Sequence, residues 1–327
     1  MTSKLILLAL SAAALAGCGA LVGSRADQRE IRAESLYPPI GQIVTVEGQQ
    51  VHVWVEGSGP DLVLLHGASG NLRDFTFDLA GRLTDRYRVV AFDRPGMGWT
   101  DRPDGYGGTG NTKGESPMLQ AQILQKAADQ LGVRNPVVVG HSYGGAVALA
   151  WGLERPEDTA ALVLLGAVSM PWPGDLGALY SINSSAIGGA TVVPLITAFA
   201  PDSRIDDVLG SIFAPQSAPE GYSDRVGVGL SLRRTSLRSN AQQVNTLRPH
   251  IVEMRAQYTD TLNMPIELVH GAADTTVPPQ IHAQEFIKLV SQANLTMLPG
   301  VGHMPHHADP QATVAAIDRA AGAATLR

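Results

Sequence analysis

The sequence is poor in cysteine and in charge, and each shortage excludes a class of protein. Cys18 is the only cysteine among 327 residues, so no disulfide can form within the chain. Charged residues make up only 17% and hydrophobic residues 44%, a composition typical of a globular chain rather than a disordered one. The formal net charge is −6 and no basic tract occurs, which argues against a nucleic-acid partner. A repeat of fixed period is also absent, which excludes a repeat array.

The N-terminal segment is predicted to be a leader outside the fold. An apolar run, 5–16, follows Lys4; it is too short to cross a bilayer comfortably but suits the core of a secretory signal peptide. The run closes on "LAGC", Leu15 to Cys18, which resembles a bacterial lipobox. That resemblance implies a signal peptide over 1–17 and lipid attachment at Cys18, which would hold the protein on a membrane of the cell envelope. The alternative is an ordinary signal peptide with a chance cysteine.

The residues after this cysteine predict a connection to the membrane. Gly19 stands where an aspartate would favour inner-membrane retention, so the expected location is the periplasmic side of the outer membrane where two membranes exist. Residues 18–40 are interpreted as a tether, with "YPP" at 37–39 ending any helix.

Strand and helix patterns alternate along the rest of the chain. Two alternating runs around Gly48 predict a β-hairpin. The later strand patterns are continuous apolar runs at 61–67, 87–96, 136–140, 160–168, 265–271 and 295–300. Helical patterns lie at 72–83, 118–131, 146–153, 279–290 and 310–321. Alternation of this kind predicts a mostly parallel α/β sheet covered on both faces, with a site at the carboxyl ends of its strands.

One long interval lacks strand patterns. From 170 to 264 only short helical patterns occur, such as 205–213 and 242–258, separated by proline and glycine. Nearly a hundred residues is too long for a simple connection between core strands. The sequence therefore predicts a helical cap at 170–264 inserted into a core formed by 41–169 and 265–327.

The clearest chemical motif is "GHSYG", Gly140 to Gly144, which fits G-x-S-x-G between a predicted strand and a predicted helix. In that context the serine occupies a sharp turn, and the small residues allow close backbone packing around it. The free N–H groups of the following helix can stabilise negative charge beside the serine. We therefore expect Ser142 to be a nucleophile; the alternative is a glycine-rich turn with an incidental serine.

With this motif the chain from about 41 to 321 resembles the α/β-hydrolase fold superfamily, which implies an eight-stranded, mostly parallel sheet. That family places an acid and then a histidine after the serine in chain order. The resemblance assigns these roles to Asp274 in "LVHGAADTTVP" and to His303 in "LPGVGHMPHHADP". His306 and His307 are rival bases. Asp274 could instead be a turn residue and His303 a surface histidine.

The same resemblance implies an oxyanion hole built from backbone N–H groups. Tyr143 follows the nucleophile, and Ala68 lies in the loop "HGASG". His66 and His141 are interpreted as packing residues. The stretch "FDRPGMGWTDRP", with Asp93, Arg94 and Trp99, is interpreted as shaping a loop.

These residues favour an esterase but leave the substrate open. Relatives with an aspartate nucleophile, the haloalkane dehalogenases and epoxide hydrolases, are excluded because Ser142 holds that position. We expect a carboxylesterase-like serine hydrolase that needs no cofactor or metal. Carbon–carbon bond hydrolysis, lactone opening and perhydrolysis use the same triad, and a tethered ligand-binding protein without activity is a further alternative.

The predicted cap offers two opposing signals about the substrate. The segment 177–201 contains no charged residue, so an apolar roof over Ser142 and a neutral ester substrate are expected. Four arginines, at positions 225, 233, 234 and 238, could instead bind a substrate carboxylate, although a solvated helix face is the preferred interpretation.

Overall fold

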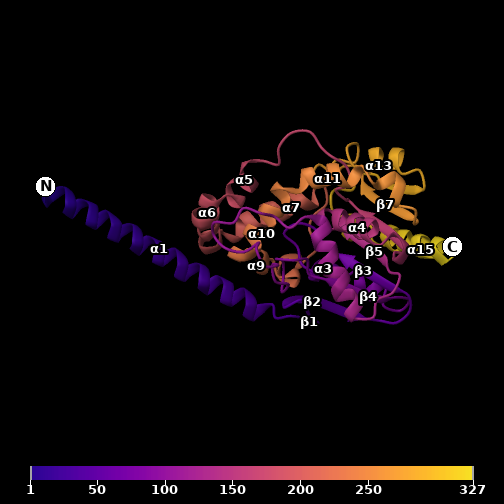
Figure 1. The fold of residues 1–327 in the computed structure, drawn as a ribbon, viewed down its shortest axis with the longest axis horizontal. Coiled ribbons are helices and arrows are strands. Elements are labelled where there is room, and N and C mark those ends of the chain that lie inside the picture. The colour runs from indigo at the N-terminus through magenta and orange to yellow at the C-terminus, as the bar shows by residue number, and fades with distance from the viewer. Residues whose placement is uncertain (1, 326–327) are drawn as a thin grey trace.

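An eight-stranded sheet forms the centre of the molecule (Figure 1). The structure is a computed structural model that describes residues 2–325, so Met1 of the predicted leader and residues 326–327 of the predicted core lie outside it. The strands are β1 (Gln42–Val46), β2 (Gln49–Glu56), β3 (Asp61–Leu65), β4 (Arg88–Phe92), β5 (Val137–His141), β6 (Ala161–Leu165), β7 (Ile266–Gly271) and β8 (Ala293–Leu298). Their order is β1-β2-β4-β3-β5-β6-β7-β8. Only β1 and β2 run antiparallel to their neighbours, which confirms the predicted α/β fold.

The central strands are buried on both faces because their apolar residues alternate between two cores. Val63 and Leu65 of β3 face one hydrophobic cluster, whereas Leu62 and Leu64 face the other. The first cluster includes α3 (Pro117–Gln130), α4 (Tyr143–Glu154) and α13 (Ala283–Leu289). The second includes the region of α2 (Arg73–Thr76), η1 (Ala80–Arg82) and α15 (Pro310–Thr325). Continuous apolar strand sequences are the consequence of burial on two sides.

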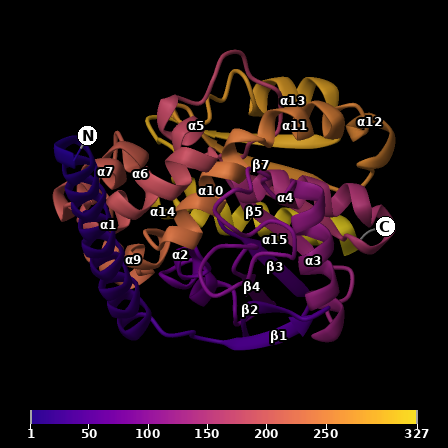
Figure 2. The same ribbon diagram turned by 60° about the vertical axis from the view of Figure 1, so that its left-hand side comes forward.

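A block of helices connects β6 to β7. They are α5 (Ala178–Ser184), α6 (Ala186–Phe199), α7 (Asp202–Phe213), α8 (Tyr222–Val226), α9 (Val228–Ser231), α10 (Arg234–Asn245), α11 (Leu247–Arg255) and α12 (Tyr258–Thr261). Figures 1 and 2 show α5, α6 and α7 gathered beside one end of the core, whereas α11 lies farther along it, close to α13. The single helical pattern expected over 242–258 is divided at Thr246, because Pro249 has no N–H to donate to the carbonyl oxygen of Asn245.

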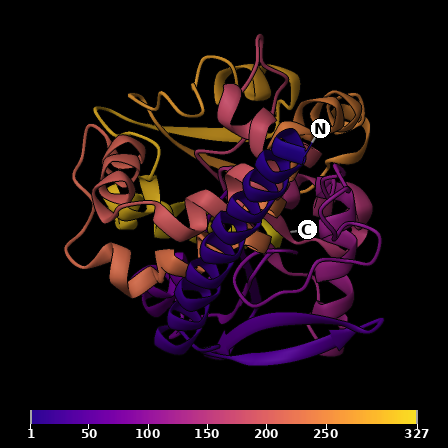
Figure 3. The same cartoon turned by 90° about the vertical axis from the view of Figure 1, so that its left-hand side faces the viewer.

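The segment interpreted as a tether is instead part of a docked helix. α1 (Thr2–Leu36) projects from the body at its start and lies across the helical block at its end (Figures 1 and 3). Ala26 and Ala33, seven residues apart and therefore on one face, are buried against that block. Arg234 pairs with Asp27 and Glu30. Small buried residues and ion pairs thus replace the flexible connection that the sequence suggested for 18–40.

Candidate active site

Ser142 is held in a strained turn between β5 and α4. Its backbone has φ 53° and ψ −117°, a region that residues with a side chain rarely occupy. Its N–H donates to the carbonyl oxygen of Leu165 at 3.0 Å, and its own carbonyl oxygen accepts from Val168 at 3.1 Å. Because the end of β6 and the loop after it hold both backbone groups, the turn keeps this conformation and presents the hydroxyl at the carboxyl end of the sheet.

The glycines around this turn are required by close backbone approach. A Cβ on Gly144 would collide with the carbonyl oxygen of Leu65, and one on Gly145 would collide with the side chain of Ala167. α4 therefore packs directly on β3 and on the residues after β6. The motif's small residues allow α4 to begin immediately after the serine, as the sequence predicted.

Three side chains form a continuous hydrogen-bonded chain at this turn. The Oγ of Ser142 lies 2.9 Å from Nε2 of His303, and Nδ1 of His303 lies 2.8 Å from Oδ2 of Asp274. All three residues are buried. With Nδ1–H donating to the carboxylate, Nε2 is left unprotonated and can accept the hydroxyl proton. The residues come from the turn after β5, from the loop after β7 and from the loop after β8, which meet at one edge of the sheet.

The carboxylate of this chain is kept ionised. Burial alone would raise the pKa of Asp274, but hydrogen bonding to His270 and His303 and a backbone N–H from Val277 lower it well below its usual value. The other carboxylate oxygen accepts from the N–H groups of Thr276 and Val277 at 2.9 and 2.8 Å. Asp274 is thus both fixed in orientation and charged, as a group must be to stabilise an imidazolium.

The two predicted oxyanion donors flank the serine. Tyr143 is the first residue of α4, where a backbone N–H has no acceptor within the helix. Ala68 lies in the loop after β3, and this loop approaches the nucleophile closely: a Cβ on Gly67 would lie 3.2 Å from Cβ of Ser142. The next residue, Ser69, has φ 55° and donates its N–H to Oδ1 of Asn240 on α10 at 2.7 Å. A helix between β6 and β7 therefore helps to shape this loop.

The side chain of Arg94 contacts both segments that carry the predicted oxyanion donors, the loop after β3 and the start of α4. Its Nε donates to the carbonyl oxygen of His66 at 2.8 Å and its Nη2 to that of Gly67 at 3.0 Å. Its Nη1 donates to the amide oxygens of Gln120 and Gln243, and its guanidinium lies 4.4 Å from the centre of the Tyr143 ring. Among the described residues, no carboxylate accepts a hydrogen bond from this fully buried cation, and burial lowers its pKa to about 10.

The neighbouring residues of that motif also organise the loop. Asp93 accepts from Nδ1 of His52 at 2.6 Å and from the N–H groups of Leu72 and Trp99. Nε1 of Trp99 donates to the carbonyl oxygen of Tyr37. These contacts agree with the loop-shaping role expected from the sequence.

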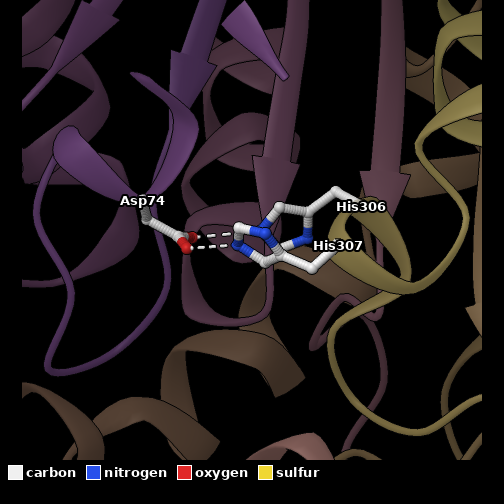
Figure 4. Close-up of side chains that lie close together, drawn as sticks. All are labelled: Asp74, His306 and His307. Carbon is white, nitrogen blue, oxygen red and sulfur yellow. Dashed lines mark hydrogen bonds and ion pairs between the residues drawn. The ribbon is translucent and has the colours of Figure 1, made fainter. Parts of the chain in front are cut away.

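The rival histidines belong to a separate cluster that the sequence did not reveal. Nε2 of His306 and Nε2 of His307 lie 3.1 and 2.8 Å from the two carboxylate oxygens of Asp74, which follows β3 (Figure 4). Tyr222 of α8 donates its hydroxyl to the same carboxylate at 2.7 Å. Burial would raise the pKa of Asp74, yet the two imidazoles hold it well below its usual range. The three potential ligand atoms of Asp74, His306 and His307 lie within 4.8 Å of one another, but reciprocal hydrogen bonds already satisfy them.

Two further histidines lie near the hydrogen-bonded chain: His141 contacts His303, and His66 lies in the loop after β3. Nε2 of His141 lies 3.0 Å from the carbonyl oxygen of His303, and the two rings are 4.9 Å apart. Burial lowers the pKa of His141 well below its usual value, and burial likewise lowers that of His66 to about 4. Both rings are therefore neutral near pH 7. They serve as packing and hydrogen-bonding residues, as expected.

The four arginines of the helical block do not form a solvated face, so that interpretation is wrong for three of them. Arg233 and Arg234 pair with acidic residues of α1. Arg238 is buried and donates to the carbonyl oxygens of three loop residues, because its guanidinium fills space beside Gly189. Arg225, the most peripheral, stacks on Phe77. Their sequence density reflects helix docking rather than exposure.

A match to a family model now identifies the class of protein. The model described as the alpha/beta hydrolase family matches residues 62–317, and the chain belongs to that family.

Relatives of known description perform different hydrolytic reactions. The chain is 27% identical over 249 residues to a 2-hydroxymuconate semialdehyde hydrolase from Pseudomonas putida, covering 74% of this chain and 80% of that protein. It is 24% identical over 284 residues to haloalkane dehalogenase 2 from Mycobacterium tuberculosis, covering 86% and 95%. A crystal structure of an alpha/beta hydrolase fold protein from Burkholderia ambifaria superposes with a TM-score of 0.70 at 23% identity, covering 85% and 97%. These similarities support a hydrolase and leave the bond it cleaves open.

Proposed function

We propose that this protein is a serine hydrolase that cleaves carboxylic esters of small to medium, neutral, apolar substrates. The observation that carries the proposal is the hydrogen-bonded chain from Asp274 through His303 to Ser142. A serine hydroxyl is a weak nucleophile at neutral pH and requires an adjacent base. The 2.9 Å contact with His303 supplies that base in the reactive tautomer.

The proposed reaction has two halves. Ser142 Oγ attacks the ester carbonyl carbon while its proton passes to Nε2 of His303. The N–H groups of Ala68 and Tyr143 bind the developing oxyanion, and His303 then protonates the departing alkoxide, which leaves an acyl-enzyme. In the second half, water loses a proton to His303 and attacks the acyl carbon. Ser142 is released when the proton returns to its Oγ.

Carbon–carbon bond hydrolysis is the second candidate, favoured by the similarity to the 2-hydroxymuconate semialdehyde hydrolase. The anionic substrate of such a reaction needs a cationic partner within the site. Arg233 and Arg234 are paired with acidic residues of α1, and Arg238 is bonded to backbone carbonyl oxygens. Cations already engaged elsewhere favour a neutral substrate over an anionic one.

The leader is the remaining part of the proposal. We propose that residues 1–17 are removed and that Cys18 receives lipid, which anchors the enzyme to a bacterial membrane, with the outer membrane favoured by Gly19. Cys18 is exposed on α1, as a modified residue requires. Among residues 16–325, whose side chains the structure describes, no single helix is long and apolar enough to span a membrane, although the bent pair α5 and α6 meets the criteria of length and composition together.

Labelling and turnover test the proposal in sequence. A fluorophosphonate probe is expected to label the wild-type protein and not Ser142→Ala, whose unfolding transition should stay unchanged. We then expect kcat/KM for p-nitrophenyl butyrate to exceed that for an anionic vinylogous diketone. Labelling of Ser142→Ala would overturn the nucleophile, whereas a clear preference for the diketone would overturn the ester class alone.

A further inference from the structure

The helices α5 and α6 carry an apolar surface that faces outward. We define the apolar cap face as Leu179 and Ile182 of α5 with Ile187 and Leu195 of α6. Ile187 is 79% exposed and Leu179 60% exposed. No charged residue occurs between Gly177 and Pro201, so water meets an unbroken uncharged segment there. Several large apolar side chains exposed on two helices in contact indicate an interaction surface.

α1 covers the end of α6, where the guanidinium of Arg25 lies 5.2 Å from the centre of the Phe199 ring, and leaves Ile187 and Leu195 exposed. Nε of Arg25 donates to the carbonyl oxygen of Ala198 at 2.9 Å, and Nη1 of Arg29 donates to that of Ala200 at 2.8 Å. The two arginines thereby satisfy carbonyl oxygens at the end of α6 that lack helical partners. The contact fixes the direction in which α1 leaves the body, and Figures 1 and 3 show its first half continuing past α6.

The proposed lipid attachment point lies close to the apolar cap face. Cys18 precedes Arg25 by seven residues, which is about 10 Å along an α-helix. The intervening stretch, 19–24, is uncharged, and Leu21 within it is 64% exposed. A lipid on Cys18 therefore brings a bilayer to the end of the molecule where these side chains are exposed.

We propose that the apolar cap face rests in the interface of the membrane that holds Cys18, with Leu195 and its neighbours inserted at the level of the lipid headgroups and upper acyl chains. The inference depends on the proposed lipid attachment. The occupant is a phospholipid bilayer recognised through apolar insertion, because the face itself contributes no cation to attract anionic headgroups. Docking in this way fixes the orientation of the enzyme on the membrane.

The docked helices also reach the site through a short series of contacts. α5 and α6 both pack on α10. On α10, Oδ1 of Asn240 accepts the N–H of Ser69, beside the proposed oxyanion donor Ala68. A membrane in contact with α5 and α6 is thus linked, through α10 and Asn240, to the loop proposed to bind the developing oxyanion.

Site-specific fluorescence tests this orientation in the full, lipidated protein. Lipid attachment consumes the only native thiol, so Leu195→Cys introduces the single free thiol of the mature chain. An environment-sensitive fluorophore at this position should emit at shorter wavelength in phosphatidylcholine vesicles and be quenched by doxyl-labelled lipid. The matched control is Val252→Cys on α11, because Val252 is 50% exposed and Leu195 47% exposed. Figures 1 and 2 show α11 far from α6.

We expect quenching at position 195 to exceed that at position 252 by at least threefold. Equal quenching at both positions in vesicle-bound protein would overturn the docked face while leaving the lipid anchor intact. An unmodified Cys18 in the mass spectrum, with no co-sedimentation with vesicles, would overturn the anchor and the docked face with it. The hydrolysis of p-nitrophenyl butyrate is measured for both labelled variants. If this activity is retained, a failure of membrane docking is distinguished from a failure of the proposed reaction.

Discussion

Replacement of Arg94 by methionine tests whether a buried cation supports the oxyanion loop. The side chain donates four hydrogen bonds, to the carbonyl oxygens of His66 and Gly67 and to the amide oxygens of Gln120 and Gln243. Methionine preserves much of the volume but donates none of them. Two backbone carbonyls beside the nucleophile are then left buried without their donor.

Two opposing contributions set the magnitude. Hydrogen bonds from a charged donor contribute about 1.5–3 kcal/mol each, so the lower end for four of them is about 6 kcal/mol. Burial lowers the pKa of Arg94 to about 10, and removing that buried cation returns about 3 kcal/mol. The hydrogen bonds therefore prevail, and we expect Arg94→Met to lower the free energy of unfolding by about 3 kcal/mol.

Catalysis should suffer more than binding, because the oxyanion forms only in the transition state. Removal of one oxyanion donor costs about a hundredfold or more in kcat, and a displaced donor should cost about tenfold to a hundredfold. Urea unfolding and p-nitrophenyl butyrate kinetics measure the two effects on the same sample. Arg94→Lys is the control: it keeps the charge but cannot span all four acceptors, so both losses should be intermediate. An unchanged unfolding midpoint with kcat within twofold of wild type in Arg94→Met would refute the reasoning.

Three further results are expected. Burial lowers the pKa of His66 and His282 to about 4, below the value near 6.5 of an unfolded chain. The unfolded state therefore binds more protons at acidic pH. The free energy of unfolding should have its full value above pH 6.5 and should fall by about 3 kcal/mol per residue as the pH drops from 6.5 to 4. Urea titrations at pH 7 and pH 4 measure this loss. His303→Ala should abolish ester hydrolysis, whereas His307→Ala should retain it within tenfold in steady-state assays; the reverse pattern would show that the base is misassigned. Arg234→Ala, which breaks the pairs with α1, should speed proteolysis within 18–36, and an unchanged cleavage rate would count against the docked helix.

Local sequence patterns were sufficient for the sheet and for the three residues of the proposed triad. Each strand is a short apolar run bounded by turn residues, and parallel strands bring their carboxyl ends to one edge. Ser142, Asp274 and His303 each follow such a strand, so strand order and the family resemblance together gave their positions. The turn at Ser142 was also predictable, because few residues other than glycine fit beside its strained backbone and the glycines of G-x-S-x-G are visible in the sequence.

Contacts between residues far apart in the sequence could not be predicted from local patterns. Asp74 has no motif around it, and its partners His306 and His307 lie more than 230 residues away, so hydrogen bonding among them could not be read from spacing. The same holds for Arg94, whose acceptors come from α3 and α10 as well as from its neighbouring loop. Charged and polar residues in a sequence are assigned to the surface by default, and only the fold reveals which are buried with partners.

The docking of α1 changes what the proposed lipid anchor would do for this protein. A flexible tether of about 20 residues would separate its ends by about 25 Å and would let the catalytic domain turn freely above the membrane. A helix fixed by Arg25, Arg29 and Arg234 instead places the start of the mature chain about 10 Å from the first of these contacts, in one direction. Ala26 and Ala33 show why the helix can lie so close, because larger residues would hold it away from its partners. In the proposed arrangement, the contacts that hold the lipid anchor also present the apolar cap face to the bilayer, and a substitution that releases α1 should loosen both together.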